Sequence, residues 1–340
     1  MAKTLGRKIL LGHGSGGRLM HGLIQELFLP KLSNPILRQL TDSAVLDLGG
    51  KRLAFTTDSF VVSPLFFKGA DIGKLAICGT VNDLVMLASQ PKFISLAMII
   101  EEGLDYKILE RIVDSIALHA RKEKVYIATG DLKVVEKGAC DKIFINTSGV
   151  GVILRNRKLS PKLIKPDDGI ILTGKIAEHG LSVLAGRKGI NLDFNIKSDC
   201  NSLSVLLLPI LKQGYEIKFM RDPTRGGLAT TLNEIADASG FGIMIEEEKI
   251  PVSSKVKAAC ELLGLDPLYI ANEGKAVLVV SKKHAPLVLK QLRKHPLGRN
   301  ASVIGRVIRS PKKKVFLKTV VGTERIIDML TSENLLPRIC

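Results

Sequence analysis

The sequence predicts an α+β fold in two domains, and three observations support this prediction. The chain has 340 residues, more than one hydrophobic core usually organises, and 46% of them are hydrophobic, enough to fill two cores. Segments with the apolar periodicity of strands and of helices occur together in both halves. A polar stretch with two prolines, residues 155–169, separates the halves.

The predicted domains are residues 1–155 and residues 156–330, the second of α/β type, followed by a mobile tail over residues 331–340. In the first domain the apolar patterns predict helices over 19–28, 72–88 and 106–122, and strands over 52–57, 93–100, 125–128 and 142–154. The strand at 125–128 is expected to end at Thr129-Gly130-Asp131. In the second domain the patterns predict strands over 169–172, 216–219, 243–245, 276–280 and 302–308, and a helix over 228–239.

Composition narrows the class of protein. The longest apolar stretches, such as residues 94–100, are far shorter than the ~18 residues of a membrane span, and no hydrophobic segment follows Met1. We therefore expect no membrane association and a cytoplasmic location. The five cysteines lie at least 60 residues apart, a spacing that matches neither a zinc site nor a disulfide framework. His119, His179 and His284 are expected to be solvated or hydrogen-bonded within the fold.

The net charge of +17 is concentrated in residues 281–340, which hold 14 Lys and Arg against 3 Asp and Glu. Such a surface can be solvated without a partner, dock an acidic protein or bind nucleic acid. Nucleic acid is the least favoured of the three, because aromatic residues make up only 4% of the chain and no helix-turn-helix, zinc-finger or RNA-binding signature is found.

The last residue of the sequence is a cysteine, Cys340, which follows Pro337, Arg338 and Ile339. A thiol there has no later residue to cover it, so we expect it to be exposed, and the thiolate is the nucleophilic form of cysteine. The alternative is that this cysteine has no function.

A glycine-rich loop, Gly12-His13-Gly14-Ser15-Gly16-Gly17, precedes the first predicted helix. The N–H groups of such a loop and the positive end of the following helix can bind a phosphate. The pattern matches neither a P-loop, because no Gly-Lys-Ser/Thr closes it, nor a dinucleotide-binding fingerprint. A flexible loop without function is the alternative.

Carboxylates also recur in turn-like positions along the chain, at Asp42, Asp58, Asp83, Asp131 and Asp222. Magnesium binds carboxylate and phosphate oxygens, so such residues can form a Mg-nucleotide site if the fold brings them together. Aspartate is equally a common turn and helix-cap residue. The most specific of these segments is Arg221-Asp222-Pro223-Thr224-Arg225-Gly226-Gly227, which places two guanidinium groups, a carboxylate and two glycines before a predicted helix.

These segments together resemble the HypE family of hydrogenase maturation factors, in the aminoimidazole ribonucleotide synthetase-like superfamily. The resemblance covers nearly the whole chain. It rests on residues 13–17 of the glycine loop, residues 57–64, Gly79-Thr80-Val81-Asn82-Asp83-Leu84, residues 221–227, Asn272-Glu273-Gly274 and the terminal Pro-Arg-Ile-Cys. Lys68-Gly69-Ala70 and Leu132 depart from the family pattern, and Leu132 makes the contacts beside Asp131 less certain.

The resemblance implies an enzyme that uses ATP and Mg²⁺. A carbamoyltransferase, HypF, would place a carbamoyl group on the Cys340 sulfur, and this protein would dehydrate it to a thiocyanate. The cyanide would then pass to iron in a HypC–HypD complex and become a ligand of nickel-iron hydrogenase. The family architecture further implies a homodimer whose N-terminal sheets pair.

The resemblance also implies roles for individual residues. Cys340 would be the acceptor, and Glu273 and Lys133 would handle protons. The alternatives are that Glu273 is only a turn residue and that Lys133 is only a surface lysine. Lys137 can take the role of Lys133. The implied metal ligands are Asp42, Asp58, Asp83 and Asp222. The implied nucleotide-binding residues are Gly12, His13, Gly14, Ser15, Gly16, Gly17, Asp58, Asn82, Asp83, Asp131, Arg221, Thr224, Arg225 and Gly226.

Two alternatives compete with this reading. One is a small-molecule kinase or synthetase of the same superfamily in which Cys340 is idle. The other is a basic, non-enzymatic scaffold.

Overall fold

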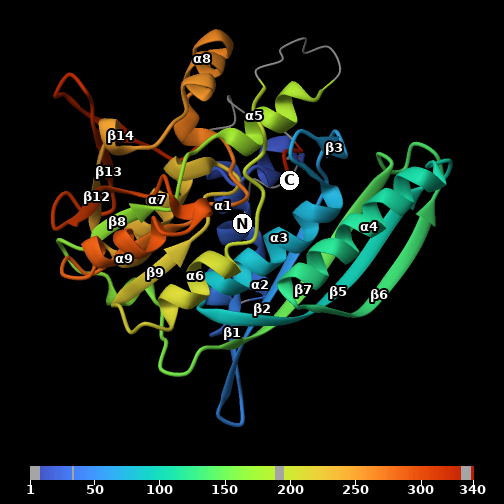
Figure 1. Cartoon of the computed structure of the whole chain (residues 1–340), viewed down its shortest axis with the longest axis horizontal. Coiled ribbons are helices and arrows are strands. Elements are labelled where there is room, and N and C mark those ends of the chain that lie inside the picture. Colours follow the sequence, from blue (N-terminus) through green and yellow to red (C-terminus); the bar gives the residue numbers. More distant parts are fainter. Residues whose placement is uncertain (1–7, 33, 188–194, 331–337) are drawn as a thin grey trace.

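The computed structural model describes residues 8–32, 34–187, 195–330 and 338–340. Two β-sheets with their covering helices lie side by side and form two lobes (Figure 1). Strands of the first sheet come from residues before 154 and strands of the second from residues after 168. The α+β class predicted from the sequence is therefore confirmed.

In the described residues the first sheet has five strands in the order β1-β2-β7-β5-β6. They are β1 (Ala44–Leu48), β2 (Lys51–Phe60), β7 (Ile143–Ile153), β5 (Ser89–Glu101) and β6 (Tyr126–Val135). Neighbouring strands are antiparallel except β5 and β6, which are parallel. Helices α3 (Ile72–Met86) and α4 (Tyr106–Glu123) cover one face of the sheet (Figure 1), and the short strands β3 (Phe66–Phe67) and β4 (Ala70–Asp71) precede α3.

Helix α3 belongs to the first lobe and also contacts the second. It is buried on nearly all sides, with Lys74 and Asp83 the exceptions, as expected for an apolar helix packed between two layers. The Asp71 carboxylate caps its N-terminus by accepting hydrogen bonds from the N–H groups of Gly73 and Lys74 at 2.8 and 3.0 Å. Near its other end, the Asn82 amide donates to the carbonyls of Asn201 and Glu273 in the second lobe, both at 3.1 Å.

The second sheet has seven strands in the described residues, in the order β14-β13-β10-β12-β8-β11-β9. They are β14 (Glu324–Ile327), β13 (Val315–Lys318), β10 (Gly242–Glu246), β12 (Ser302–Ile308), β8 (Gly169–Leu172), β11 (Val277–Val280) and β9 (Ile217–Arg221). The helices of this lobe are α5 (Glu178–Ala185), α6 (Ser204–Leu211), α7 (Gly227–Ser239), α8 (Ser254–Leu263) and α9 (Ala285–Leu292). Single turns occur at Pro161–Leu163, Glu247–Lys249, Pro267–Tyr269 and Pro296–Gly298.

The segment before β1 packs against the second lobe. It contains the turn η1 (Leu11–Gly14), α1 (Arg18–Leu23), a π-helical turn (Ile24–Phe28), α2 (Leu29–Leu32) and a last turn (Leu37–Gln39). The Arg18 N–H donates to the Leu330 carbonyl at 3.0 Å, and the His21 ring lies 2.8 Å from the Glu234 carboxylate on α7. The predicted helix over 19–28 is therefore present, although its second half is π-helical.

Strand β6 differs from the prediction in length. The sequence predicts an end at residue 128 and a turn at Thr129-Gly130-Asp131, but β6 continues to Val135 because it pairs with β5 as far as Glu101. Asp131 and Lys133 therefore lie within a strand. The residues of β6 are almost all exposed, and Tyr126, Leu132 and Val134 are 72%, 56% and 64% exposed. None of the helices in the described ranges is long and apolar enough to cross a membrane.

Candidate active site

A cavity lies at the junction of the two lobes and is lined by acidic side chains from both. Six carboxylates line it, and only two cationic side chains among the described lining residues, Arg221 and Arg225, oppose them. The carboxylates belong to Asp42, Asp58, Asp83, Asp222, Glu234 and Glu273. We name this space the acidic cavity.

The acidic residues reach the cavity from the ends of separate elements. Asp58 lies near the end of β2 and Asp83 near the end of α3, both in the first lobe. Asp222 directly follows β9, and Glu234 lies on α7. Carboxylates that are far apart in sequence therefore become neighbours where the lobes meet.

Burial raises the pKa of the carboxyls of Asp42, Asp58, Asp83, Asp222 and Glu273. Burial is the main cause that raises the pKa of Asp42 to about 6. The pKa values of Asp83, Asp222 and Glu273 lie well above their ordinary range, first because of burial and then because of neighbouring carboxylates. Burial raises the pKa of Asp58 as well. Such a cluster of carboxylates has too few positive charges nearby to balance it.

The two arginines occupy different places in the cavity. Arg221 lies between two carboxylates, with its Nε 3.2 Å from Asp42 and 2.8 Å from Glu234. Arg225 donates from Nη1 to the Gly14 carbonyl at 3.1 Å, which holds the glycine-rich loop against the cavity. Gly16 in that loop has φ +79°, and a Cβ there would lie 2.7 Å from the Arg225 carbonyl oxygen. Only glycine fits this position without strain.

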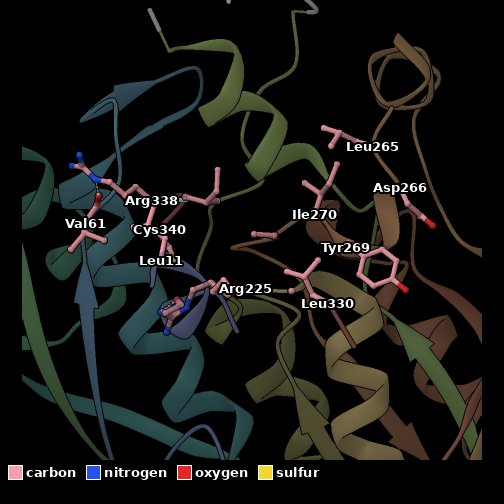
Figure 2. A pocket seen from close by; sticks show the side chains of 15 residues that line it. Leu11, Val61, Arg225, Leu265, Asp266, Tyr269, Ile270, Leu330, Arg338 and Cys340 are labelled. Atoms are coloured by element: carbon pink, nitrogen blue, oxygen red, sulfur yellow. Dashed lines mark hydrogen bonds between the residues drawn. The ribbon is translucent and has the colours of Figure 1, made fainter. Parts of the chain in front are cut away.

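A second, more apolar cavity adjoins the first, and Arg225 and Cys340 line both. Figure 2 shows Val61, Arg338, Cys340 and Arg225 on one side of it. The opposite side carries Leu265, Ile270, Tyr269 and Leu330. Cys340 thus lies where an apolar space and an acidic space meet.

Residues 338–340 are docked beside the end of β2. The N–H groups of Val61 and Ser63 donate to the carbonyls of Cys340 and Arg338 at 3.0 and 3.1 Å. The Arg338 side chain donates from Nε to the Val61 carbonyl at 2.9 Å and from Nη1 to the Asp141 carboxylate at 2.5 Å. The Ile339 side chain is 5% exposed in the core. We name this arrangement the dock.

The last three residues of the predicted mobile tail over 331–340 are docked in this structure, residues 331–337 lie outside the described ranges, and the mobility of the tail stays a prediction. The expectation of an exposed thiol is wrong for this docked state, because Cys340 is half-buried. Burial raises the pKa of the Cys340 thiol to about 12, although the nearby Arg225 charge opposes this shift. A docked Cys340 is consequently a neutral thiol at physiological pH, not a nucleophilic thiolate.

Most of the residues predicted to form a site are brought together. Those that line the acidic cavity are Gly16, Asp42, Asp58, Asp83, Arg221, Asp222, Thr224, Arg225, Glu273 and Cys340, and those that line the apolar cavity include Gly14, Ser15 and Gly226. The Gly12 carbonyl accepts from the Ser15 hydroxyl, the His13 ring accepts from the Leu10 N–H just before the loop, and a Cβ at Gly17 would lie 2.4 Å from the Leu330 carbonyl oxygen.

Asp131, Lys133 and Asn82 lie elsewhere. Asp131 and Lys133 form an exposed ion pair with each other at 2.9 Å on β6 and line neither cavity. The Asn82 amide oxygen accepts from the Leu203 N–H at 2.7 Å, and its nitrogen donates to the backbone of the second lobe. Asn82 therefore positions the loop that carries Glu273.

Sequence reasoning missed three residues of this region: Glu234, His179 and Asp141. His179 and Asp141 are recognised through partners far along the chain, Ile339 and Arg338, whereas Glu234 pairs with Arg221 from the neighbouring segment. No local pattern marks such pairs. Only the acidic Glu234, which follows the Arg221–Gly227 segment on the predicted helix, could have been suspected.

Comparison with known proteins identifies the family to which the chain belongs. Sequence profiles described as AIR synthase related protein, N-terminal domain and C-terminal domain, match residues 40–153 and 165–318. The carbamoyl dehydratase HypE of Cupriavidus necator is 46% identical over 98% of this chain and 95% of its own length. The chain belongs to the HypE family.

Solved structures agree with this family membership. A crystal structure of HypE in complex with ATP is 46% identical, covers 98% of this chain and 100% of its own, and superposes with a TM-score of 0.82. HypE in a crystal structure of the HypE–HypF complex is also 46% identical, with coverage of 91% and 99% and a TM-score of 0.86. A thiamine monophosphate kinase from Aquifex aeolicus, 22% identical over 91% of this chain and 99% of its own with a TM-score of 0.64, shares the fold alone with the HypE family.

Proposed function

We propose that this protein is an ATP-dependent carbamoyl dehydratase that converts an S-carbamoyl group on Cys340 into a thiocyanate. The observation that carries this proposal is the position of Cys340, which lines the same acidic cavity as Asp58, Asp83, Asp222 and Glu273. The names of the family relatives and the ATP-bound HypE support the reaction and the substrate. The released cyanide would serve the iron centre of a nickel-iron hydrogenase.

The chemistry requires activation of a poor leaving group. The carbamoyl oxygen attacks the γ-phosphorus of ATP, forming an O–P bond as the bond to the ADP oxygen breaks, and the nitrogen gives up one proton. The C–O bond then breaks, phosphate leaves with that electron pair, and loss of the second N–H proton leaves S–C≡N. The products are thiocyanate, ADP and phosphate. The protein must align the reacting groups, balance charge and accept protons.

Two residues that line the acidic cavity with Cys340 suit these tasks. Arg225 can balance negative charge on the phosphate near the sulfur. Glu273 can accept a nitrogen proton, because a carboxylate with a strongly raised pKa is a better base than an ordinary one. The Asn82 side chain and the Asp199 carboxylate, which accepts from the Glu273 N–H at 3.1 Å, fix the loop that carries this base.

The acidic cavity also fits Mg²⁺ in its charge and donor atoms. Six carboxylates oppose two arginines, and the donors are hard oxygens. Among the described residues no group of three or more His, Cys, Asp or Glu forms a ready metal site. Magnesium commonly uses one or two carboxylates together with substrate phosphates and water. We assign Asp42, Asp58, Asp83 and Asp222 as candidate ligands, and the bound ion would neutralise charge on the polyphosphate.

The carbamoyl group should be received outside the cleft. A docked Cys340 has a pKa of about 12, so it lacks the thiolate needed to attack a carbamoyl donor. Residues 338–340 would therefore leave the dock to meet HypF, the partner seen in the HypE–HypF complex, and return with the carbamoyl group. A HypC–HypD complex would take the cyanide.

A homodimer is the assembly that the first sheet favours. Its face opposite α3 and α4 and its edge strand β6 carry exposed apolar side chains, including Phe55, Phe93, Tyr126 and Val134. An exposed apolar face with an unpaired edge strand is typical of an interface. In one chain Lys133 lies outside the cleft, so a catalytic role for Lys133 would require this second copy.

Intact-mass analysis tests the proposed function. With HypF, carbamoyl phosphate and ATP, the protein should gain the mass of a carbamoyl group and then lose one water. Cys340→Ala should show neither change, whereas Cys140→Ala, which removes another half-buried thiol, should show both. A modified Cys340→Ala protein, or ATP turnover that ignores Cys340, would refute the proposal.

A further inference from the structure

We propose that His179 holds residues 338–340 in the dock and is thereby a positioning residue for the reaction. His179 lies on α5, with its side chain fully buried and its ring 5.4 Å from the Phe67 ring in an edge-to-face arrangement. The inference deepens the proposed function, since a docked Cys340 matters for catalysis only if Cys340 is the acceptor.

The hydrogen bonds of the ring define its tautomer. Its Nε2 lies 2.9 Å from the Ile339 carbonyl oxygen, and its Nδ1 lies 2.9 Å from the Ser198 hydroxyl. A carbonyl oxygen can only accept, so Nε2 carries the proton and Nδ1 accepts from Ser198. The Ser198 oxygen in turn accepts from the Cys200 N–H at 3.0 Å.

The bond from His179 closes the dock on its second side. The carbonyls of Arg338 and Cys340 accept hydrogen bonds from Ser63 and Val61, while the carbonyl between them accepts from His179. Arg338 has φ +56°, so the segment is not a regular strand, and its carbonyls find their donors on separate elements. The backbone is therefore gripped by residues of both lobes.

His179 also favours the docked state energetically. When residues 338–340 leave, the ring N–H loses its Ile339 acceptor, so undocking costs this hydrogen bond. Burial lowers the pKa of His179, in agreement with a neutral ring that donates through Nε2 alone. The ring thus acts on the main chain of the dock and leaves Cys340 itself free to react.

The same contacts connect the dock to the proposed base. Ser198 is followed by Asp199, whose carboxylate accepts the Glu273 N–H at 3.1 Å and lies 2.9 Å from the Lys275 ammonium. One short segment therefore contacts both the ring that holds Ile339 and the loop that carries Glu273. This arrangement sets the sulfur and the base relative to each other, which an in-line reaction requires.

Alkylation of Cys340 tests the inference without HypF or ATP. The rate of modification by iodoacetamide is measured by peptide mass spectrometry, with Cys140 in the same molecule as the reference thiol. His179→Phe should accelerate alkylation of Cys340 about fivefold or more, because loss of one buried hydrogen bond releases the dock. His179→Gln should stay near the wild-type rate, since its amide nitrogen can donate in place of Nε2.

Catalytic assays then separate positioning from folding. With HypF and ATP, His179→Phe should accept the carbamoyl group at least as fast as wild type but dehydrate it more slowly, and His179→Gln should recover dehydration.

If His179→Phe does not fold, Ser198→Ala should accelerate Cys340 alkylation about two- to fivefold by removing the donor to Nδ1. The inference would be overturned if Cys340 in His179→Phe, or in its substitute Ser198→Ala, is alkylated at the wild-type rate. Equal acceleration of alkylation in His179→Phe and His179→Gln would also overturn it. A dehydration assay that fails in wild type would refute the proposed function and leave the alkylation result valid.

Discussion

The acidic cavity and the dock meet at Cys340, but they are stabilised in opposite ways. In the dock, the carbonyls of residues 338, 339 and 340 all accept hydrogen bonds and the Ile339 side chain is buried in the core. In the acidic cavity, six carboxylates oppose two guanidinium groups, and burial raises the pKa of most of them.

Within one cleft, the dock therefore contributes to stability, whereas the acidic cavity is arranged for function. The dock forms because its groups satisfy each other, so folding alone sets its geometry. In the acidic cavity the carboxylates repel each other, a cost to stability that is typical of a functional site and that bound cations would relieve. Substitutions in the two regions should therefore move stability and activity in different directions.

The largest effect is expected from Asp83→Asn and Asp222→Asn. Each removes a buried carboxylate from the acidic cavity, so dehydration should fall at least about 100-fold. Without nucleotide the variants should melt a few degrees higher than wild type, because the repulsion is reduced. Exposed Asp237→Asn, which loses only a surface ion pair with Lys313, is the control and should change neither quantity. Normal dehydration in both cavity variants would end the metal assignment.

Gly16→Ala should have the next largest effect. A Cβ at this position is strained at φ +79° and overlaps the Arg225 carbonyl, so the loop and Arg225 should both shift. We expect a loss of dehydration of about tenfold, measured by intact mass, from misalignment of the cavity. Gly22→Ala, in the helix that follows the loop, serves as a matched control, since a Cβ there meets nothing within 4 Å. Equal activities of the two variants would show that this loop plays no part in alignment.

Asp141→Asn probes the side-chain part of the dock. Its ion pair with Arg338 is 2.5 Å long but partly exposed, with side-chain exposures of 40% and 32%. Because solvent weakens such pairs, alkylation of Cys340 should rise by no more than about fivefold. A larger rise than in His179→Phe would mean that the Arg338 side chain, not the backbone, dominates docking.

The smallest effect concerns the pH dependence of stability. The pKa of Asp42 rises from 3.8 to about 6 on folding, so the folded protein binds this proton more tightly than the unfolded chain. This group therefore favours folding most below its unfolded pKa, and its contribution declines as pH rises through about 6. Without nucleotide, the melting temperature should fall less between pH 4 and pH 7 in Asp42→Asn than in wild type. Identical dependence of the melting temperature on pH in Asp42→Asn and wild type would contradict the raised pKa of Asp42.

Much of the acidic cavity could be predicted from the sequence, because its residues lie in short motifs. Asp58, Asp83, Asp222 and Arg225 each belong to a recognisable segment, and the resemblance brought Glu273 and Cys340 into the same site. The same resemblance also named Lys133 and Asp131, which β6 places on an exposed edge. Their proposed roles depend on a second chain, and the sequence of one chain does not contain that geometry.

The dock was harder to predict because its partners are distant and unpatterned. The expectation that His179 is hydrogen-bonded within the fold is correct, but nothing near residue 179 indicates that its acceptor is Ile339. Strand β6 was predicted too short for a related reason, since its last residues depend on pairing with β5 rather than on their own periodicity. Strands β1, β13 and β14 were missed altogether.

The contacts between residues 61–63 and residues 338–340 also have a consequence for the order of events during synthesis. These segments are separated by 277 positions, counted from Val61 to Arg338. At about 5–20 residues per second, the first segment is synthesised roughly 14 to 55 s before its partner. The first lobe can therefore fold before residues 338–340 are available to dock.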